Sequence, residues 1–279
     1  MLETILFVLG VVGLAAGCLA NFNTAVPQEN KVAPAAARVK HLIAHRGSCA
    51  DRPENTLASY RRAIEAGATM MEMDVRTTRD GVLISLHDAN VKRTTNGTGL
   101  ARALTMPEIR KLDAGSWFDP KYKNERIPTL REVLELGKGK IDVLLDLQEQ
   151  GDTYARRVVA EVREFGEPKR TWIGVRSVDQ AKVFRKLLPE GKQIGLIPTP
   201  DSIDAFAAAG VDMIRLWPKW LNDKTLIPRV RKHGLLLHLN GKVGAEDETR
   251  LLLMHGPDSL ASDDPGRLVR TLAKFRRAK

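Results

Sequence analysis

Short apolar runs rich in β-branched residues alternate with helical patterns from Lys40 to the end of the chain. Strands separated by helices of ten to fifteen residues are typical of βαβ units and a parallel sheet. The clearest helical patterns cover 55–66, 129–136 and 152–164. The predicted strands are eight runs: 42–44, 70–75, 82–86, 141–147, 171–175, 193–197, 211–216 and 235–239; a ninth short run, 259–262, also fits a strand.

Eight parallel strands predict a closed (β/α)₈ barrel. An open doubly wound sheet is the alternative, and the absence of a G-x-G-x-x-G turn after the first run disfavours it. The length of 279 residues suits one barrel domain of about 250 residues. The stretch 88–128 is long for a connection between a strand and a helix, so we expect a short insertion after the third strand, with a function such as covering an active site.

The N-terminus carries a separate signal. Residues 5–20 are almost wholly apolar, too short a run for a membrane span and suited to the core of a secretory signal. The segment 14–18 resembles a lipoprotein signal ending at Cys18, cleavage after Ala20 is the competing interpretation, and an uncleaved anchor is a third. Glu3 and the lack of basic residues before the run count against export. We expect residues 1–38 to be a signal peptide or anchor plus a linker, the domain to span 39–279, and the protein to be exported, either periplasmic or attached to a membrane.

The chain is basic, with a formal net charge of +10, which favours anionic partners. The charge is spread along the sequence, and the one dense stretch, 267–279, has the apolar spacing of a final helix that docks on the core. We therefore expect a small anionic substrate and no nucleic acid. Two cysteines, Cys18 and Cys49, exclude a disulfide framework and a thiolate zinc cluster.

Three carboxylates fall on predicted strands. Glu72 and Asp74 are two residues apart, so both side chains point to the same face of their strand, which must be the barrel lumen or its mouth. Buried carboxylates repel one another and lose hydration, and a divalent cation resolves both problems. Asp146 on the next-but-one run is the natural third ligand, and oxygen ligands suit Mg²⁺ or Ca²⁺. The alternative is that these carboxylates pair with arginines or lysines of the barrel.

Two histidines end the first and third predicted strands. Active sites of parallel barrels lie at the carboxyl ends of the strands, so His45 and His87 are candidates for a general acid and a general base. Arg46 offers a forked donor suited to a phosphoryl oxygen. Glu54 opens the first helix and is expected at the mouth of the barrel, where it could orient a catalytic histidine.

The order of these residues resembles the glycerophosphodiester phosphodiesterase family. The motifs that carry the resemblance are His45-Arg46-Gly47, Pro53-Glu54-Asn55-Thr56, Gly67-Ala68, Glu72-x-Asp74-Val75, Thr78-x-Asp80-Gly81, His87-Asp88, Arg93-Thr94-Thr95-x-Gly97-x-Gly99, Ile127-Pro128-Thr129-Leu130 and Ser262-Asp263-Asp264-Pro265. The match is dense over 40–148 and thin afterwards.

The resemblance implies a TIM barrel that hydrolyses glycerophosphodiesters to glycerol 3-phosphate and an alcohol. It implies that Glu72, Asp74 and Asp146 hold the metal, that His45 and His87 transfer protons, and that Arg46 contacts the phosphate. In the family scheme the substrate's own hydroxyl attacks phosphorus, and water then opens the cyclic phosphate.

The chain departs from the family pattern at three places. Asp146 stands where the family usually has Glu, Gln148 where it usually has a phosphate-binding Lys, and 237–240 lacks the usual Trp-Thr. Gln148 can donate hydrogen bonds but supplies no positive charge. The alternatives are a phospholipase D-like (sphingomyelinase D) or phosphatidylinositol phospholipase-like barrel enzyme, and an inactive protein that binds phosphoryl ligands. The retained histidines and carboxylates argue against the inactive protein.

Overall fold

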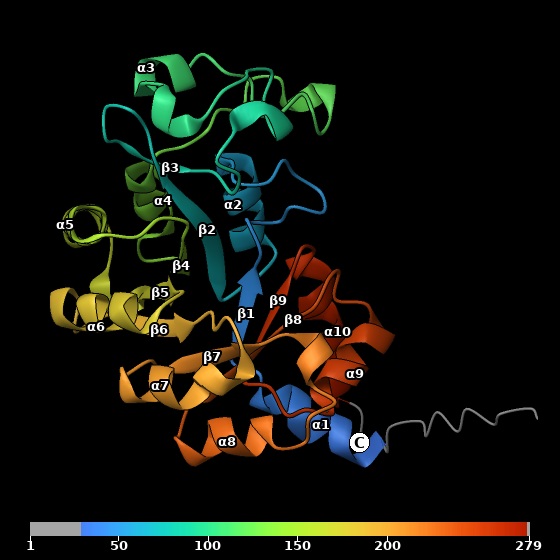
Figure 1. The fold of residues 1–279 in the computed structure, drawn as a ribbon. Coiled ribbons are helices and arrows are strands. Elements are labelled where there is room, and N and C mark those ends of the chain that lie inside the picture. Colours follow the sequence, from blue (N-terminus) through green and yellow to red (C-terminus); the bar gives the residue numbers. More distant parts are fainter. Residues whose placement is uncertain (1–28, 278–279) are drawn as a thin grey trace, which may run out of the picture.

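The computed structural model describes residues 29–277, and its central feature is a closed barrel of eight parallel strands (Figure 1). β1 pairs with both β2 and β9, which closes the ring. In order around the ring the strands are β1 (His41–Ala44), β2 (Met70–Thr77), β4 (Asp142–Leu147), β5 (Thr171–Val175), β6 (Lys192–Gly195), β7 (Met213–Leu216), β8 (Leu236–Asn240) and β9 (Ser259–Ser262). The predicted (β/α)₈ barrel is confirmed.

One predicted barrel strand is not part of the ring. The run 82–86 forms β3 (Leu83–Ser85), which pairs antiparallel with the end of β2 outside the barrel. The reason is the connection: β2 ends at Thr77, and a parallel return would need a crossover of a dozen residues or more. Gly81, with φ of 85°, instead turns the chain straight back. The eighth barrel strand is β9, the ninth run of the sequence.

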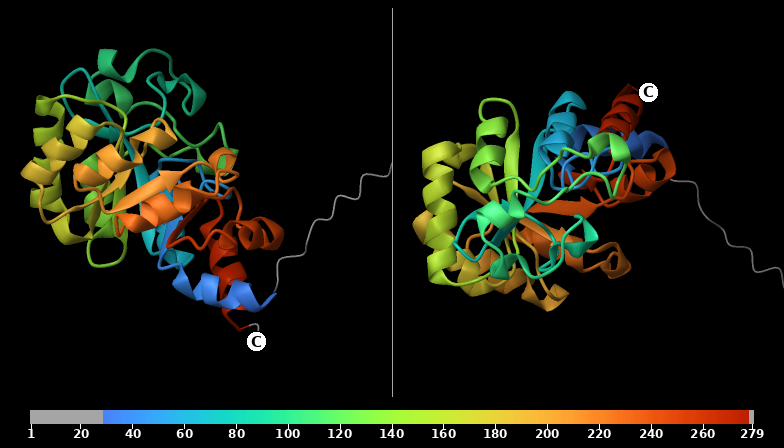
Figure 2. Two further views of the ribbon diagram at one scale, coloured as in Figure 1. Left: turned by 60° about the horizontal axis from the view of Figure 1, so that its bottom comes forward. Right: turned by 90° about the horizontal axis from the view of Figure 1, so that it is seen from above.

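Helices surround the barrel in both views of Figure 2. They are α2 (Leu57–Glu65), α4 (Leu130–Gly137), α5 (Asp152–Phe165), α6 (Val178–Leu187), α7 (Ile203–Ala208), α8 (Leu226–Lys232), α9 (Glu246–Leu253) and α10 (Pro265–Arg277). Capping boxes at Thr56 and Thr129 fix the starts of α2 and α4. The first predicted helix, 55–66, therefore begins at Leu57, two residues after its predicted start. The final amphipathic helix is confirmed as α10, whose Leu268, Leu272 and Phe275 are buried.

Residues 88–128 form the expected insertion, which lies beyond the ends of β2 and β3 in Figure 1. It holds the short helix α3 (Met106–Ile109) and the 3₁₀ turns Val91–Arg93, Ala101–Ala103 and Pro120–Tyr122. It has a small apolar core of its own, which includes Val91, Ile109 and Ile127. The insertion is therefore a packed unit at the carboxyl end of the barrel, and it follows the predicted third strand even though that strand lies outside the ring.

The domain begins before residue 39. Residues 29–38, expected to be linker, form α1 (Glu29–Arg38), whose Val32 and Ala36 are buried. Arg276 of α10 donates to the carbonyl oxygens of Ala36 and Val39 at 3.0 and 2.9 Å. The linker boundary at 38 was wrong because the apolar side of this short helix packs on the C-terminal helix. The predicted signal segment and Cys18 lie outside the described residues, and none of the described helices is long and apolar enough to cross a membrane.

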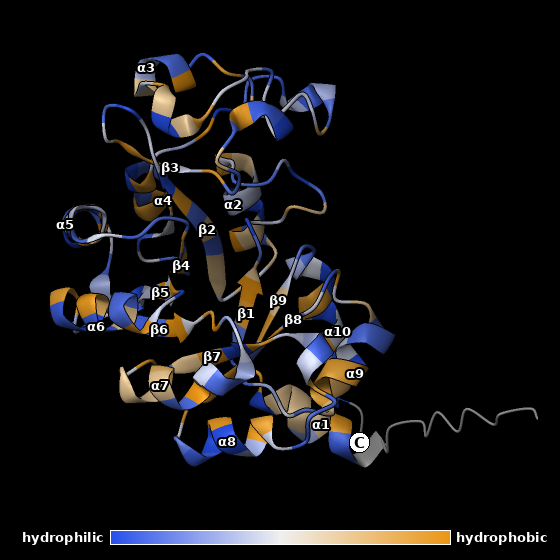
Figure 3. Cartoon of the chain, viewed as in Figure 1, coloured by the Kyte–Doolittle hydropathy of each residue, from blue (hydrophilic) through white to orange (hydrophobic). Residues whose placement is uncertain are grey.

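The barrel lumen is plugged by apolar side chains, and the barrel strands are coloured mainly hydrophobic in Figure 3. The plug consists of Ile43, Met70, Leu144, Trp172, Ile194, Leu196, Met213 and Ala261. A second, larger core fills the space between strands and helices. Because side chains alternate along a strand, the next inward positions of β1, β2, β4 and β7 towards the carboxyl ends are 45, 72, 146 and 215, which are all polar.

Candidate functional site

Three carboxylates meet in the lumen above the apolar plug. Asp74 on β2 and Asp146 on β4 are direct neighbours across the strands, and Glu72 lies one inward position below Asp74. One oxygen from each of Glu72, Asp74 and Asp146 lies within 4.8 Å of the others. Glu72 and Asp74 are buried, with exposed fractions of 4% and 1%. The structure thus brings together the three residues that the sequence predicts as metal ligands.

The proximity of the buried carboxylates to one another is electrostatically unfavourable. Burial, with the charge of Asp74, raises the pKa of Glu72 to about 8, and burial also raises the pKa of Asp74. Three oxygen donors with this much unfavourable charge suit a hard divalent cation, and no thiolate or imidazole is needed. The residues present therefore fit a hard divalent cation.

Hydrogen-bond donors also surround these oxygens. The backbone N–H of Arg46 donates to Glu72 at 2.6 Å, and Asn55 and Gln148 donate to the two oxygens of Asp74 at 2.9 and 2.6 Å. Arg176 donates to both oxygens of Asp146 at 2.6 and 2.8 Å. The alternative of pairing with arginines is thus observed at Asp146, and at Asp74 through Nε of Arg46 at 3.4 Å, while Glu72 accepts from a backbone N–H.

A strained turn after β1 places the donors on the carboxylates. Arg46 and Asn55 have φ of 53° and 57°, in the left-handed region that side chains disfavour. Gly47 has φ of 81°, and a Cβ there would lie 2.3 Å from the hydroxyl oxygen of Ser59. Non-glycine residues held in this region are concentrated at functional sites. Here the strain turns the N–H of Arg46 and the amide of Asn55 into the lumen.

Glu54 binds arginines. Its Oε1 accepts from Arg46 at 2.9 Å, and both of its oxygens accept from Arg93 of the insertion at 2.8 Å. Burial would raise its pKa, but Arg93 and Arg46 hold the pKa below the ordinary value. The expectation that Glu54 orients a histidine was wrong, because both arginines lie nearer. Glu54 fixes Arg46 and ties the insertion to the barrel mouth.

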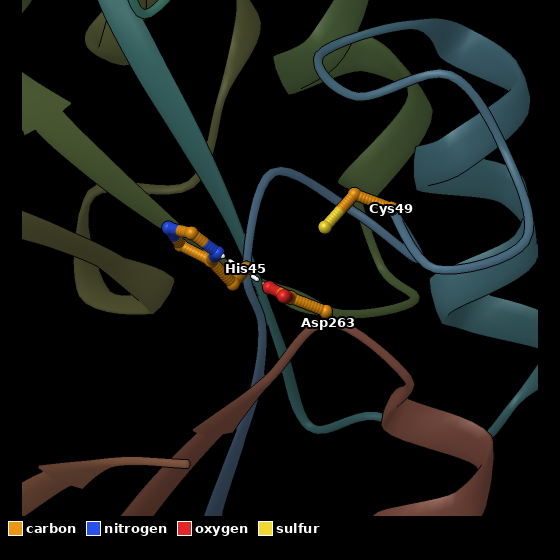
Figure 4. A group of neighbouring side chains, drawn as sticks. All are labelled: His45, Cys49 and Asp263. Atoms are coloured by element: carbon orange, nitrogen blue, oxygen red, sulfur yellow. Dashed lines mark hydrogen bonds and ion pairs between the residues drawn. The ribbon is translucent and has the colours of Figure 1, made fainter. Parts of the chain in front are cut away.

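Two aspartates orient the two histidines instead. His45 follows β1, and its Nδ1 lies 2.7 Å from Oδ1 of Asp263, which follows β9; Figure 4 shows the ring and the carboxylate facing each other, with Cys49 nearby. His87 Nδ1 lies 2.7 Å from Oδ1 of Asp88. Each pairing leaves Nε2 for proton transfer. Burial would lower the pKa of His45, but the hydrogen bond to Asp263 and the charge of Glu72 raise it overall.

The sequence prediction gave no role to Asp263. It lies in a recognised motif, yet no spacing rule joins it to His45, 218 residues away. The signal is topological: β9 pairs with β1, with Ala44 opposite Ser262, so the residues after the two strands are neighbours. Because His87 follows the antiparallel β3 and not a barrel strand, it reaches the site from the insertion side.

A cavity of about 40 Å³ lies beside His45 in the lumen. Its polar lining is His45, Glu72, Asp146, Arg215, His238 and Asn240. Arg215 and Arg176 are two cations that sequence reasoning missed. Gln148, expected to contact the substrate phosphate, uses its amide on Asp74.

Comparisons with known proteins agree with this geometry. The sequence profile of the glycerophosphoryl diester phosphodiesterase family matches residues 45–267. A glycerophosphodiester phosphodiesterase of Caldanaerobacter subterraneus is 33% identical over 240 residues, which cover 84% of this chain and 98% of that protein. One from Bacillus subtilis is 30% identical and covers 75% of this chain and 79% of its own length.

Solved structures show the same fold. The glycerophosphodiester phosphodiesterase of Agrobacterium tumefaciens superimposes with a TM-score of 0.72 at 29% identity, over 82% of this chain and 99% of that one. A phosphodiesterase of Oleispira antarctica, solved with the product sn-glycerol-3-phosphate, gives 0.74 at 24% identity, over 86% and 99%. The chain belongs to the glycerophosphoryl diester phosphodiesterase family.

Proposed function

We propose that this chain hydrolyses glycerophosphodiesters to glycerol 3-phosphate and an alcohol, with His45 and His87 as the proton-transfer pair. The observation that carries the proposal is the meeting of three carboxylates and two aspartate-oriented histidines at one barrel mouth. A protein that only binds phosphoryl ligands has no use for two oriented histidines. The family match and the product-bound Oleispira relative support the same reaction.

Glu72, Asp74 and Asp146 would hold the divalent cation that the family requires. When bound, that cation offsets negative charge on the phosphoryl oxygens. All three ligands are carboxylates, which supports Mg²⁺ or Ca²⁺ over softer metals. Asp146 must then share its oxygens with Arg176, which contacts both of them.

The histidines would act in turn on two hydroxyls. One Nε2 takes the proton from the substrate hydroxyl that attacks phosphorus, and the other gives a proton to the departing alcohol. When water opens the cyclic phosphate, the two roles reverse. The raised pKa of His45 supports its assignment as the acid of the first step, because it is more readily protonated. Arg46, fixed by Glu54, is placed to donate to a phosphoryl oxygen.

The decisive assay measures glycerol 3-phosphate released from glycerophosphocholine with Mg²⁺ or Ca²⁺, with and without EDTA. His45→Ala and His87→Ala should each lower kcat about 100-fold or more. His233→Ala is the matched control, because that histidine pairs with Asp204 between two outer helices. Tight binding of glycerol 3-phosphate without turnover of any diester would favour the inactive binding protein. Turnover of sphingomyelin or phosphatidylinositol alone would favour the related phospholipases.

The proposed location is outside the cytoplasm, with the N-terminus as signal or membrane attachment. The support is the apolar run 5–20 and the cysteine at 18. Mass analysis of the mature protein distinguishes the outcomes: a lipid adduct on Cys18, a start after Ala20, or an intact Met1. The intact chain in a cytosolic fraction would contradict export.

A further inference from the structure

Arg215 is a lumen-facing cation for which the described part of the chain provides no anionic partner. It lies on β7, and its Nε is buried without a hydrogen bond. Among residues 29–277 its guanidinium forms no ion pair within 4 Å, in contrast to Arg176, which contacts Asp146. Guanidinium groups in such places normally meet a carboxylate or phosphate, because each unmet donor costs free energy on burial.

The position of Arg215 is set by the ring. β7 lies four strands from β2 in both directions, so Arg215 faces the carboxylates of β2 across the lumen. It lines the same cavity as His45, Glu72 and Asp146. The guanidinium carbon of Arg215 lies over the ring of Trp217, 4.2 Å from the ring centroid, in a cation–π contact. The cationic head is therefore fixed and aimed at the place where the proposed chemistry occurs.

The other polar groups of the site do not supply an unpaired positive charge. His238 lies opposite Arg215 on the neighbouring strand β8 and is buried. Burial and the charge of Arg215 lower the pKa of His238 to about 3, so His238 is neutral near pH 7. Arg46 can donate to a phosphoryl oxygen, but its charge is already paired with Glu54 and Asp74. Arg176 is paired with Asp146, and Gln148 carries no charge. Burial lowers the pKa of Arg215 itself only to about 10, so it stays protonated.

Charge balance shows what the lumen lacks. Glu72, Asp74 and Asp146 carry up to three negative charges when ionised, which a divalent cation together with Arg176 would offset. A phosphodiester adds another negative charge and needs a cation that is not already paired. The cavity of about 40 Å³ has room for about three waters, or for phosphoryl oxygens in their place.

We propose that Arg215 binds the phosphoryl group of the substrate and product from β7, in place of the cation that position 148 does not supply. The proposal rests on the proposed function for its ligand. Its fork would donate to two phosphoryl oxygens on the side opposite the carboxylates.

The test is the affinity of the Mg²⁺-loaded protein for glycerol 3-phosphate, measured by calorimetry, together with KM and kcat. Arg215→Met removes the charge at similar length, and should raise Kd and KM about 10- to 100-fold, since hydrogen bonds to charged groups contribute at that level. Arg156→Met is the matched control, because Arg156 lies on α5 with its side chain 64% exposed, and its Kd should stay within about twofold of wild type. An unchanged Kd in Arg215→Met would overturn the proposal.

Two further variants distinguish phosphate binding by Arg215 from loss of folding and from simple neutralisation of the carboxylate charge. Arg215→Lys keeps the charge without the fork and should fall between wild type and Arg215→Met. Gln148→Lys should restore more affinity in the Arg215→Met background than it adds to wild type. If Arg215→Met only tightened Mg²⁺ binding and left Kd for glycerol 3-phosphate unchanged, Arg215 would merely balance the carboxylates. A third outcome separates this proposal from the proposed function. If the wild-type protein hydrolysed no diester, but bound glycerol 3-phosphate and Arg215→Met did not, the proposed function would fail and the assignment of Arg215 as the phosphate cation would stand.

Discussion

Asp263 offers a direct test of histidine orientation, through the substitution Asp263→Asn. The carboxylate lies 2.7 Å from His45 Nδ1, and the two side chains are 40% and 34% exposed. Partly exposed ion pairs contribute at most about 1 kcal/mol to stability, so the thermal midpoint should move by only a few degrees. The effect on rate should be far larger. An asparagine removes the negative charge that favours the imidazolium needed as the acid of the first step. An amide that donates to Nδ1 also leaves a proton on Nε2, so Nε2 cannot accept one in the second step, and we expect kcat to fall about 100-fold or more.

The pH profile adds a second readout. Asp263 raises the pKa of His45, so its loss should move the limb of the rate profile that reports His45 to lower pH. Asp264→Asn is the matched control: it removes the neighbouring charge, and asparagine can keep the hydrogen bond from the Arg267 N–H at the start of α10. If Asp263→Asn retained kcat within about threefold and an unmoved limb, the orientation of His45 by Asp263 would be refuted.

Three other predictions concern stability. Folding raises the pKa of Glu72 from 4.5 to about 8. In the EDTA-treated protein, the contribution of Glu72 to the free energy of unfolding should therefore be fully present below pH 4.5 and lost as the pH rises through 8. Thermal melts across this range should show the loss, and Mg²⁺ or Ca²⁺ should reverse it; parallel curves with and without metal would contradict the metal site. A chain beginning at residue 39 should be less stable than one beginning at 29 by roughly 2 kcal/mol or more in urea unfolding, because it lacks the buried Val32 and Ala36. Asn55→Ala should be less stable than Asn55→Gly by about 1 kcal/mol, since both lose the hydrogen bond to Asp74 but only alanine strains the left-handed backbone; equal midpoints would show that the turn relaxes.

The fold could be predicted because the repeat of apolar residues that marks a strand or a helix depends only on nearby positions in the sequence. Runs such as 141–147 and 171–175 needed no knowledge of their partners to be recognised as strands. Pairing direction was harder: β3 has the composition of a barrel strand, and only the five-residue gap after Thr77 shows that it must turn back. α1 was missed for another reason, because ten residues with an internal proline do not make a stable helix alone. Its helical state depends on α10 at the other end of the chain.

The site divides in the same way. Glu72 and Asp74 could be placed together because two residues on one strand share a face, and Asp146 was added as an inward carboxylate on the next run but one. The structure makes β2 and β4 direct neighbours, because β3 lies outside the ring. The partners of the histidines and of Glu54 could not be assigned, since side-chain pairing at the barrel mouth depends on which loops meet there. Asp263 and Arg93 reach their partners from opposite ends of the sequence.

The cation at the phosphate is where motif and geometry differ most. A motif assigns the positive charge to a position along one strand, and at position 148 this chain has an amide. A barrel places inward side chains of one layer around a common axis, so a cation on β7 can face the same phosphoryl group as one following β4. A replacement at 148 is therefore not evidence of lost chemistry unless every inward position of that layer has been inspected. If Arg215 binds the phosphate, Gln148 is free to keep Asp74 in place through its 2.6 Å hydrogen bond. A lysine at 148 would bring charge to the phosphate and take that neutral donor from Asp74, so in wild type the two effects should partly cancel.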